Sequence, residues 1–143
     1  LSFTIVGDGV LFDETVEPLR DLPNVRIEQC FLQQDEIAEL HKAHGIFLCP
    51  SRMDTQGVSR DEAMSSGLVP ITNSVGAIPD FVTDESCMLA AAEDFIGIAT
   101  AVEELYFDEN LFLNMSRAAQ KNVRENRSLS DILVKELKVI NDD

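Results

Sequence analysis

Short apolar runs and amphipathic stretches alternate along most of this chain. Runs typical of strands occur at residues 1–6, 24–30, 45–49, 69–72 and 88–90. Helical periodicity occurs between them at residues 12–22, 34–43 and 59–66, and again in two or three pieces from residue 93 to about residue 139. Alternation at this spacing predicts an α/β fold, with a mostly parallel sheet and helices on both faces.

The composition is that of an ordinary soluble globular protein. The 143 residues suffice for one domain with a sizeable core, and 45% of them are hydrophobic. No run is long or apolar enough to cross a membrane, and no export leader is visible. Because Leu1 already lies inside the first predicted strand, we expect residues 1–143 to be one domain of a longer chain.

The charge and the cysteines narrow the choice of partners. A formal net charge of −15 repels nucleic acid and anionic membranes, so we expect neither as a partner. The acids either keep the domain soluble or complement a basic partner domain. Cys30, Cys49 and Cys87 lack the spacing of zinc ligands, and their odd number fits reduced thiols in the cytoplasm. The sequence contains no Asp-x-Asp cluster, so we expect no metal site.

A polar loop and a helix start follow the apolar run at residues 45–49. The loop carries Asp54 and Gly57, and the helix that is predicted to begin at Ser59 carries Glu62. In open α/β sheets, ligands bind just past the carboxyl ends of strands, where loops meet helix N-termini. We therefore expect both acids at the edge of the sheet where a small molecule would bind.

Each of these residues also has a purely structural interpretation. Ser59 and Glu62 have the spacing of a capping box, in which each side chain bonds the other residue's backbone amide. Asp54 is of a type that stabilises turns through its own backbone. Gly57 either lets the backbone approach a ligand or supplies a positive φ angle. The residues alone leave these alternatives open.

Two further glycine-bearing turns follow strands. The turn at residues 7–9 lacks the third glycine of a dinucleotide fingerprint and is a weak phosphate cradle. Gly76 precedes a short helix near Ile78, whose free amides would suit a pyrophosphate, unless the glycine serves only a turn. His41 and His44 flank a helix end, and we expect them at the surface or in capping.

The order of these segments resembles the C-terminal domain of retaining glycosyltransferases of family 4, which have the GT-B fold. The resemblance covers nearly the whole chain and rests on residues 5–9, 24–25, 50–51, 54–70 and 75–80. It implies a Rossmann-like domain that lacks the family's first strand–helix unit. It also implies the donor-binding half of an enzyme that moves a hexose from a nucleotide-diphosphate sugar to an acceptor hydroxyl, with the anomeric configuration retained.

The resemblance also implies the partners. The donor is the nucleotide sugar, with no separate cofactor and no metal. The acceptor-binding domain is expected on the N-terminal side of the same polypeptide, and any membrane association would come through that domain. We expect this chain alone to be inactive, since chemistry in such enzymes occurs between the two domains.

The resemblance assigns roles to individual residues. Asp54 and Glu62 occupy the places of two family glutamates, the first near the donor sugar and the second on the ribose hydroxyls. A carboxylate suits a ribose because it accepts from two hydroxyls at once. Gly57 matches a glycine that lets the loop approach the donor. Val58 and Ser59 match positions whose amides lie near the diphosphate.

Gly76 and Ile78 match a second donor-facing segment of the family. Asp54 departs from the family pattern in being one methylene shorter than Glu, which reduces its reach to the sugar. Gln56 stands where an aromatic residue is common.

The family's Arg and Lys, which neutralise the diphosphate, belong to a segment that precedes the equivalent of Leu1. Arg52 and Arg60 are the nearby substitutes, and we expect Arg60 to face solvent.

The missing first strand lies at the centre of the family's sheet. We therefore expect the strands at residues 1–6 and 45–49 to pair directly, the sheet to be rearranged, or a strand to be exchanged in a dimer.

Two other functions stay open. One is a non-catalytic nucleotide- or protein-binding module, suggested by Asp54 and the absent basic pair. The other is a nucleotide-sugar epimerase of the GT-B fold.

Overall fold

The computed structural model describes residues 1–127 and 129–141 of the chain. It divides into two compact units, Leu1–Glu39 and Leu40–Asp143, each with its own sheet. None of the helices in the described ranges is long and apolar enough to cross a membrane.

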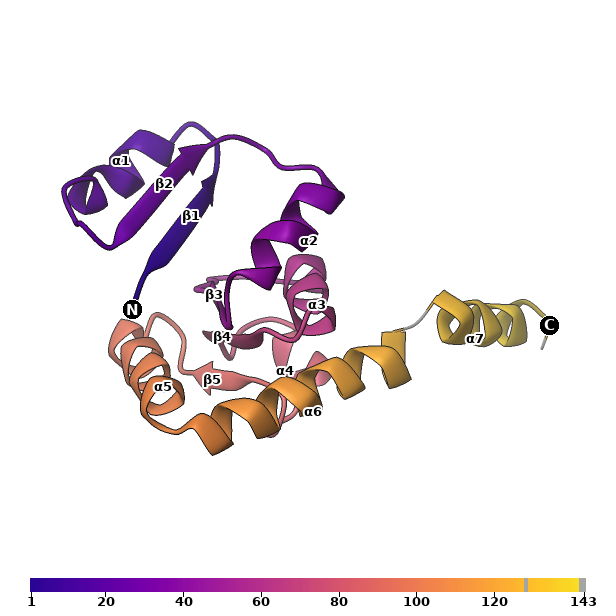
Figure 1. Ribbon diagram of the computed structural model, residues 1–143. Coiled ribbons are helices and arrows are strands. Elements are labelled where there is room, and N and C mark those ends of the chain that lie inside the picture. The colour runs from indigo at the N-terminus through magenta and orange to yellow at the C-terminus, as the bar shows by residue number, and fades with distance from the viewer. Residues whose placement is uncertain (128, 142–143) are drawn as a thin grey trace. The chain divides into compact units, whose positions relative to one another are not determined.

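The first unit is built around two parallel strands (Figure 1). Strand β1 (Phe3–Gly7) pairs with β2 (Val25–Gln29) along all five residues of each. The connection between them contains α1 (Phe12–Val16) and the short 3₁₀ helix η1 (Glu17–Leu19). Val16 is buried in this unit, and α2 (Gln34–Lys42) leads out of it into the second.

The second unit contains a three-stranded parallel sheet in the order β3–β4–β5. Its strands are β3 (Ile46–Cys49), β4 (Val69–Asn73) and β5 (Met88–Ala90). Its helices are α3 (Val58–Ser65), α4 (Ile78–Phe81), α5 (Phe95–Phe107), α6 (Glu109–Arg127) and α7 (Leu129–Asn141).

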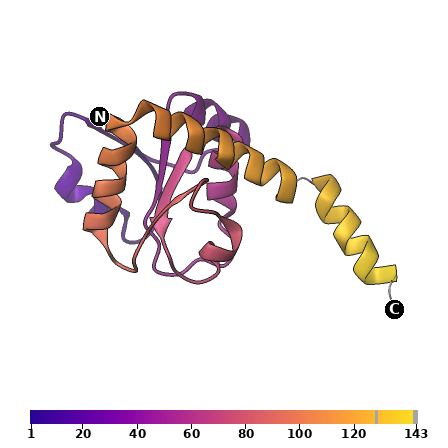
Figure 2. The same ribbon diagram turned by 90° about the horizontal axis from the view of Figure 1, so that it is seen from below.

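Strand β4 is the centre of the second unit, and all five of its residues are buried. Val69 and Ile71 pack with apolar side chains of α5 and α6 on one face, where these helices lie across the sheet (Figure 2). A second cluster, on α3, α4 and α6, includes Met64 and Ile78. A strand that is covered on both faces has a nearly continuous apolar sequence, and this explains why the sequence predicts a strand at residues 69–72.

The structure confirms the predicted α/β architecture with parallel strands and flanking helices, but one expectation about the sheet is wrong. The described residues contain no ladder between β1 and β3, which pair with β2 and with β4 respectively. The boundary between the units falls between β2 and β3, so no ladder joins the two sheets in the part of the chain that the structure describes. A rearranged sheet and strand exchange between copies both stay predictions.

Candidate functional site

The carboxyl end of β4 ties the neighbouring loops together through Asn73. This side chain is 3% exposed, and its Oδ1 accepts from the amide of Ser51 at 3.1 Å, while its Nδ2 donates to the carbonyl of Ala91 at 2.6 Å. The loops after β3 and β5 are thereby fixed to the central strand. The sequence places Asn73 in a loop, and only its position as the last residue of β4 explains this role.

The loops after β3 and β4 touch through their backbones. The amide of Ala77 donates to the carbonyl of Asp54 at 3.2 Å. Gly76 has a φ angle of +54°, and a Cβ built on it would lie only 2.3 Å from that carbonyl oxygen. Two segments that the sequence marked separately are therefore in contact, and the approach depends on a glycine.

Asp54 shapes the loop that it begins. Its Oδ1 accepts a hydrogen bond from the amide of Gln56 at 3.0 Å. This is the turn role that the sequence allowed for an aspartate, and the side chain is half-buried. The carboxylate thus holds the loop that leads to Gly57 and α3.

Helix α3 begins at Val58, one residue earlier than predicted. Gly57 is its N-cap with a φ angle of 72°, and no side chain caps the helix. The predicted capping box is therefore wrong, because Ser59 is already the second helical residue and does not occupy the capping position. The first amides of α3 have no helical acceptor, and they carry the positive end of the helix dipole at the end of the loop.

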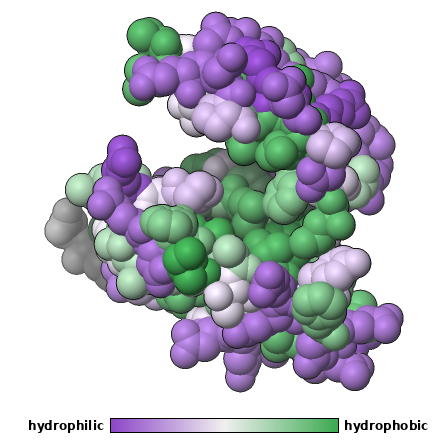
Figure 3. All heavy atoms as spheres, turned by 90° about the vertical axis from the view of Figure 1, so that its left-hand side faces the viewer, coloured by the Kyte–Doolittle hydropathy of each residue, from purple (hydrophilic) through white to green (hydrophobic). Residues whose placement is uncertain are grey.

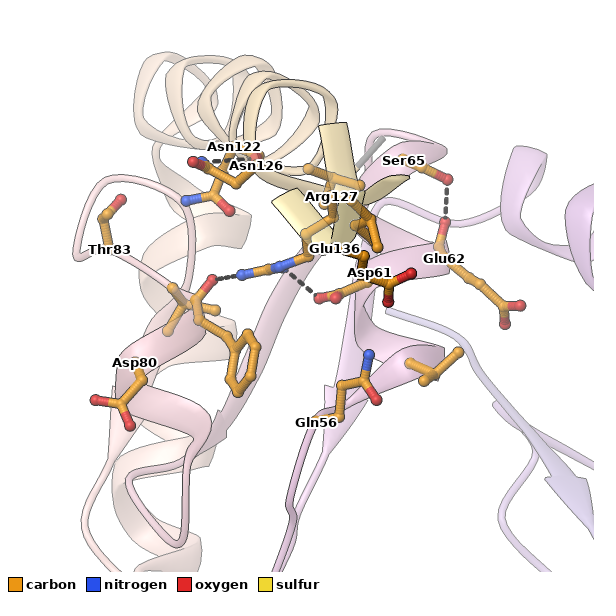
Figure 4. Close-up of a pocket in the computed structure, with 15 residues that line it drawn as sticks. Gln56, Asp61, Glu62, Ser65, Asp80, Thr83, Asn122, Asn126, Arg127 and Glu136 are labelled. Carbon is orange, nitrogen blue, oxygen red and sulfur yellow. Dashed lines mark hydrogen bonds and ion pairs between the residues drawn. The ribbon is translucent and has the colours of Figure 1, made fainter. Parts of the chain in front are cut away.

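Glu62 lies half-buried on α3 and lines a cavity of about 760 Å³ together with Asp61 and Ser65 (Figure 4). The carboxylates of Asp61 and Glu62 point to different sides, Asp61 toward Arg127 and Glu62 away from it. Ile78 lies apart from these side chains, 1% exposed in the second core cluster, and its amide donates to the carbonyl of Val75 at 3.1 Å.

The prediction that Arg60 faces solvent is wrong, because its side chain is 1% exposed. Its Nη2 donates to the carbonyl of Gln56 at 2.7 Å, and its Nε and Nη2 lie 3.2 and 3.0 Å from Asp61 Oδ1. The buried face of α3 consists of Arg60, Ala63 and Met64. That i, i+3, i+4 spacing was visible in the sequence and would have placed the arginine inside.

A second arginine, Arg127 at the end of α6, also bonds to Asp61. Arg127 donates to Asp61 Oδ1 at 2.6 Å and to the carbonyl of Phe81, and the guanidinium groups of Arg60 and Arg127 lie 5.1–5.7 Å from the Phe81 ring centroid. Burial raises the pKa of the Asp61 carboxyl, against the opposing effect of the two guanidinium groups. Burial also lowers the pKa of Arg127, while Asp61 opposes that change.

His41 is also buried, at 7% exposed, so its expected place at the surface is wrong. Its Nδ1 lies 3.3 Å from Ser66 Oγ, and its ring meets the Phe47 ring edge-on. Burial lowers the pKa of His41, and the nearby Glu62 opposes that shift. His44 Nδ1 donates to the carbonyl of Leu40 at 2.8 Å, a bond at the helix end that fits the expected capping role.

A smaller cavity of about 480 Å³ opens at the carboxyl ends of the strands of the second sheet. Arg52 lies there with an exposed side chain and forms an ion pair of 2.9 Å with Glu93. Within the ranges that the structure describes, no group of three or more acidic, histidine or cysteine residues is placed to hold a metal ion.

Comparisons with known sequences indicate one family. The family model for glycosyl transferases group 1 matches residues 1–108. The N-acetyl-alpha-D-glucosaminyl L-malate synthase of Bacillus anthracis is 31% identical over 123 residues, which are 85% of this chain and 32% of that protein. The chain spans about a third or less of the length of the curated relatives that it matches.

Solved structures share the fold. The Anabaena protein Alr3699/HepE, crystallised with UDP, has a TM-score of 0.85 at 14% identity, over 100% of this chain and 41% of that one. The C-terminal domain of the group 1 glycosyl transferase LpcC from Francisella tularensis has a TM-score of 0.69 at 18% identity, over 90% of this chain and 87% of that one.

Proposed function

Because this chain belongs to the group 1 glycosyl transferases, we propose that it binds the nucleotide-sugar donor in a two-domain enzyme of the GT-B fold. The observation that carries this proposal is the contact between the loops after β3 and β4, where the amide of Ala77 donates to the carbonyl of Asp54. These loops follow the carboxyl ends of adjacent parallel strands, where such sheets bind ligands.

The donor chemistry follows from the resemblance. The reaction would transfer a hexose from a nucleotide-diphosphate sugar to an acceptor hydroxyl and retain the anomeric configuration. HepE was crystallised with UDP and with UDP-glucose, which makes a uridine nucleotide the first donor to test here.

The diphosphate would lie at the uncapped start of α3. Gly57 turns the backbone into the helix, and the amides of Val58 and Ser59 follow in its first turn. Backbone donors and the helix dipole together favour an anion at such a position. The failure of the predicted capping box supports this role, because it leaves these amides without a side-chain acceptor.

The remaining roles belong to the two acids and the second loop. Glu62 would accept hydrogen bonds from the ribose hydroxyls, and Asp54 would lie near the donor sugar. Gly76 would hold the second loop against the first. Ile78 would act through its place in the core, since its amide already donates to the carbonyl of Val75.

Arg60 does not serve as the cation that neutralises the diphosphate, because its guanidinium is buried and already bonded to Gln56 and Asp61. Arg52 is exposed, but it pairs with Glu93. A departing diphosphate needs compensating positive charge. We therefore propose that the remaining charge comes from the rest of the full-length protein.

An N-terminal acceptor-binding domain is the proposed partner. Several large apolar side chains of the second unit reach the surface, among them Phe95 and Phe107. Figure 3 shows hydrophobic residues in green beside the hydrophilic ones in purple on the side of the molecule that it draws. Exposed apolar surface of this kind is typical of domains that pack against another part of a protein.

We also propose a cytoplasmic location for the enzyme, which the three free cysteines fit.

Calorimetric titration of the full-length protein with UDP, GDP and ADP tests the donor role. We expect one nucleotide to bind saturably and Glu62→Ala to weaken that binding at least about ten-fold, the effect of losing hydrogen bonds to a charged group. Glu103→Ala, an exposed acid on α5, is the matched control and keeps full affinity. Equal affinity of the parent and Glu62→Ala would contradict the assignment of Glu62.

A non-catalytic binding module is the second candidate, and the engagement of Asp54 Oδ1 within its own turn favours it. Sugar transfer by the full-length protein and by Asp54→Ala separates the two. Transfer that is lost in the variant supports the enzyme. Nucleotide binding without transfer in the parent supports the module.

A further inference from the structure

The guanidinium of Arg60 lies directly beneath the loop that carries Asp54 and Gly57. Its Nη2 donates to the carbonyl of Gln56 at 2.7 Å. A Cβ built on Gly57 would lie 2.6 Å from Nη1 and 2.7 Å from Cζ of the same side chain. The glycine therefore makes room for the arginine on the inner side of the loop, in addition to adopting a positive φ angle.

A buried arginine at this position needs an explanation. Burying a charge is costly unless it is paired, and a long apolar side chain of similar volume often stabilises a core as well or better. Ala63 and Met64, on the same face of α3, are apolar. Arg60 Nη1 is also buried without a hydrogen-bond partner among the described residues. The features that an apolar residue would lack are the bonds from Arg60 to the loop and to Asp61.

The guanidinium is itself held from two sides. Asp61 Oδ1 accepts from Arg60, and the same oxygen accepts from Arg127 at the end of α6. The ring of Phe81 lies against both guanidinium groups, with centroid distances of 5.7 and 5.1 Å. This arrangement fixes where the Arg60 donor to Gln56 can point.

We propose that Arg60 is a positioning residue that fixes the backbone of the loop at residues 54–57 from inside the protein. Asp61 and Arg127 orient it, so the loop is tied to the C-terminal end of α6. The consequence for donor binding rests on the proposed function, since Arg60 would act on the donor only through the placement of Asp54 and Gly57.

Hydrogen exchange followed by mass spectrometry on the full-length protein tests the positioning role without any ligand. In Arg60→Met, we expect faster exchange of the amides that bond to this loop, by at least about ten-fold, as for the loss of one charge-assisted hydrogen bond. These are the amide of Gln56, which donates to Asp54 Oδ1, and the amides of Asp61 and Ala77, which donate to the carbonyls of Gly57 and Asp54. Protection of β4 stays unchanged. Arg60→Lys keeps a donor for the Gln56 carbonyl and restores part of the protection. Arg52→Met is the control, because Arg52 is an exposed arginine just before this loop, and it should leave the protection of the loop as in the parent.

Unchanged exchange of the loop in Arg60→Met would overturn the proposal, and so would an equal loss of protection in β4, because Arg60 would then act on the whole unit. If Arg60→Met does not fold, Arg127→Met decides in its place, because it removes one of the groups that orient Arg60. Faster exchange of the loop with β4 unchanged supports the positioning role, and no change overturns it.

Titration of the same variants with UDP separates this proposal from the proposed function. Faster exchange of the loop together with weaker UDP binding supports both. Faster exchange with unchanged UDP affinity keeps the positioning role of Arg60 and contradicts the donor role of the loop.

Discussion

Gly76 and Glu93, in the loops after β4 and β5, both have φ angles in the left-handed region, at 54° and 57°. Glycine adopts this conformation freely, whereas a residue with a Cβ is strained there by about 1–2 kcal/mol. The surroundings also differ, since Gly76 presses against the backbone of Asp54, while Glu93 extends to the exposed side chain of Arg52. The two positions therefore respond in opposite ways to substitution.

Gly76→Ala is expected to lower the free energy of unfolding by about 2 kcal/mol or more, since it adds left-handed strain to a collision with the Asp54 carbonyl oxygen. Urea denaturation measures the change. Gly7→Ala is the control, because a Cβ there meets nothing within 4 Å. Equal stability of the parent and Gly76→Ala would mean that the two loops do not approach as closely as the structure shows.

Glu93→Gly is expected to raise the free energy of unfolding by about 0.5–1 kcal/mol, because it removes the left-handed strain. The lost ion pair with Arg52 does not offset this gain, since both side chains are exposed and such pairs contribute little. Glu93→Ala loses the same ion pair but keeps the strain, so it should not stabilise. A stabilised Glu93→Ala, or a destabilised Glu93→Gly, would show that the ion pair outweighs the backbone.

At the scale of elements, α3 shows what the sequence can and cannot predict. Its position and length follow from the pattern, and its buried face follows from the spacing of Arg60 and Met64. Its first residue was misplaced because a glycine in a left-handed conformation leaves no signal that separates it from an ordinary turn glycine. The bond from Arg127 joins residues 66 positions apart, and no local pattern reports it.

The contact between α2 and the end of α3 predicts a dependence of stability on pH. Burial lowers the pKa of His41 below its usual value of 6.5, so the folded state binds its proton less readily than the unfolded state. The contribution of His41 is therefore present above pH 6.5 and is lost as the pH falls through the folded pKa. The attraction of Glu62 for a protonated ring weakens this effect but does not reverse it.

Thermal unfolding of the parent and of His41→Gln, from above pH 7 to about pH 5, measures this dependence. The stability of the parent should fall relative to His41→Gln as the pH is lowered. His44→Gln removes a neighbouring charge that also lowers the pKa of His41, so its pH profile should lie between those of the parent and His41→Gln. Parallel pH profiles for the parent and His41→Gln would contradict the inferred cause of the shift.

At the scale of the whole molecule, the alternation of strand and helix was enough to predict parallel strands and flanking helices. It was not enough to predict two separate sheets, because strand pairing depends on which strands share a packed unit, and the pattern along the chain is the same in either case. The family match then shows the class of protein, and the solved structures share its fold. The proposed donor site lies in the loops after β3 and β4.

A crystal structure of the full-length protein with UDP tests the donor site most directly. We expect the diphosphate within about 3 Å of the amide of Val58 or Ser59, and the ribose hydroxyls within the same distance of the Glu62 carboxylate. UDP bound away from the loops after β3 and β4, with Glu62 out of contact, would contradict it.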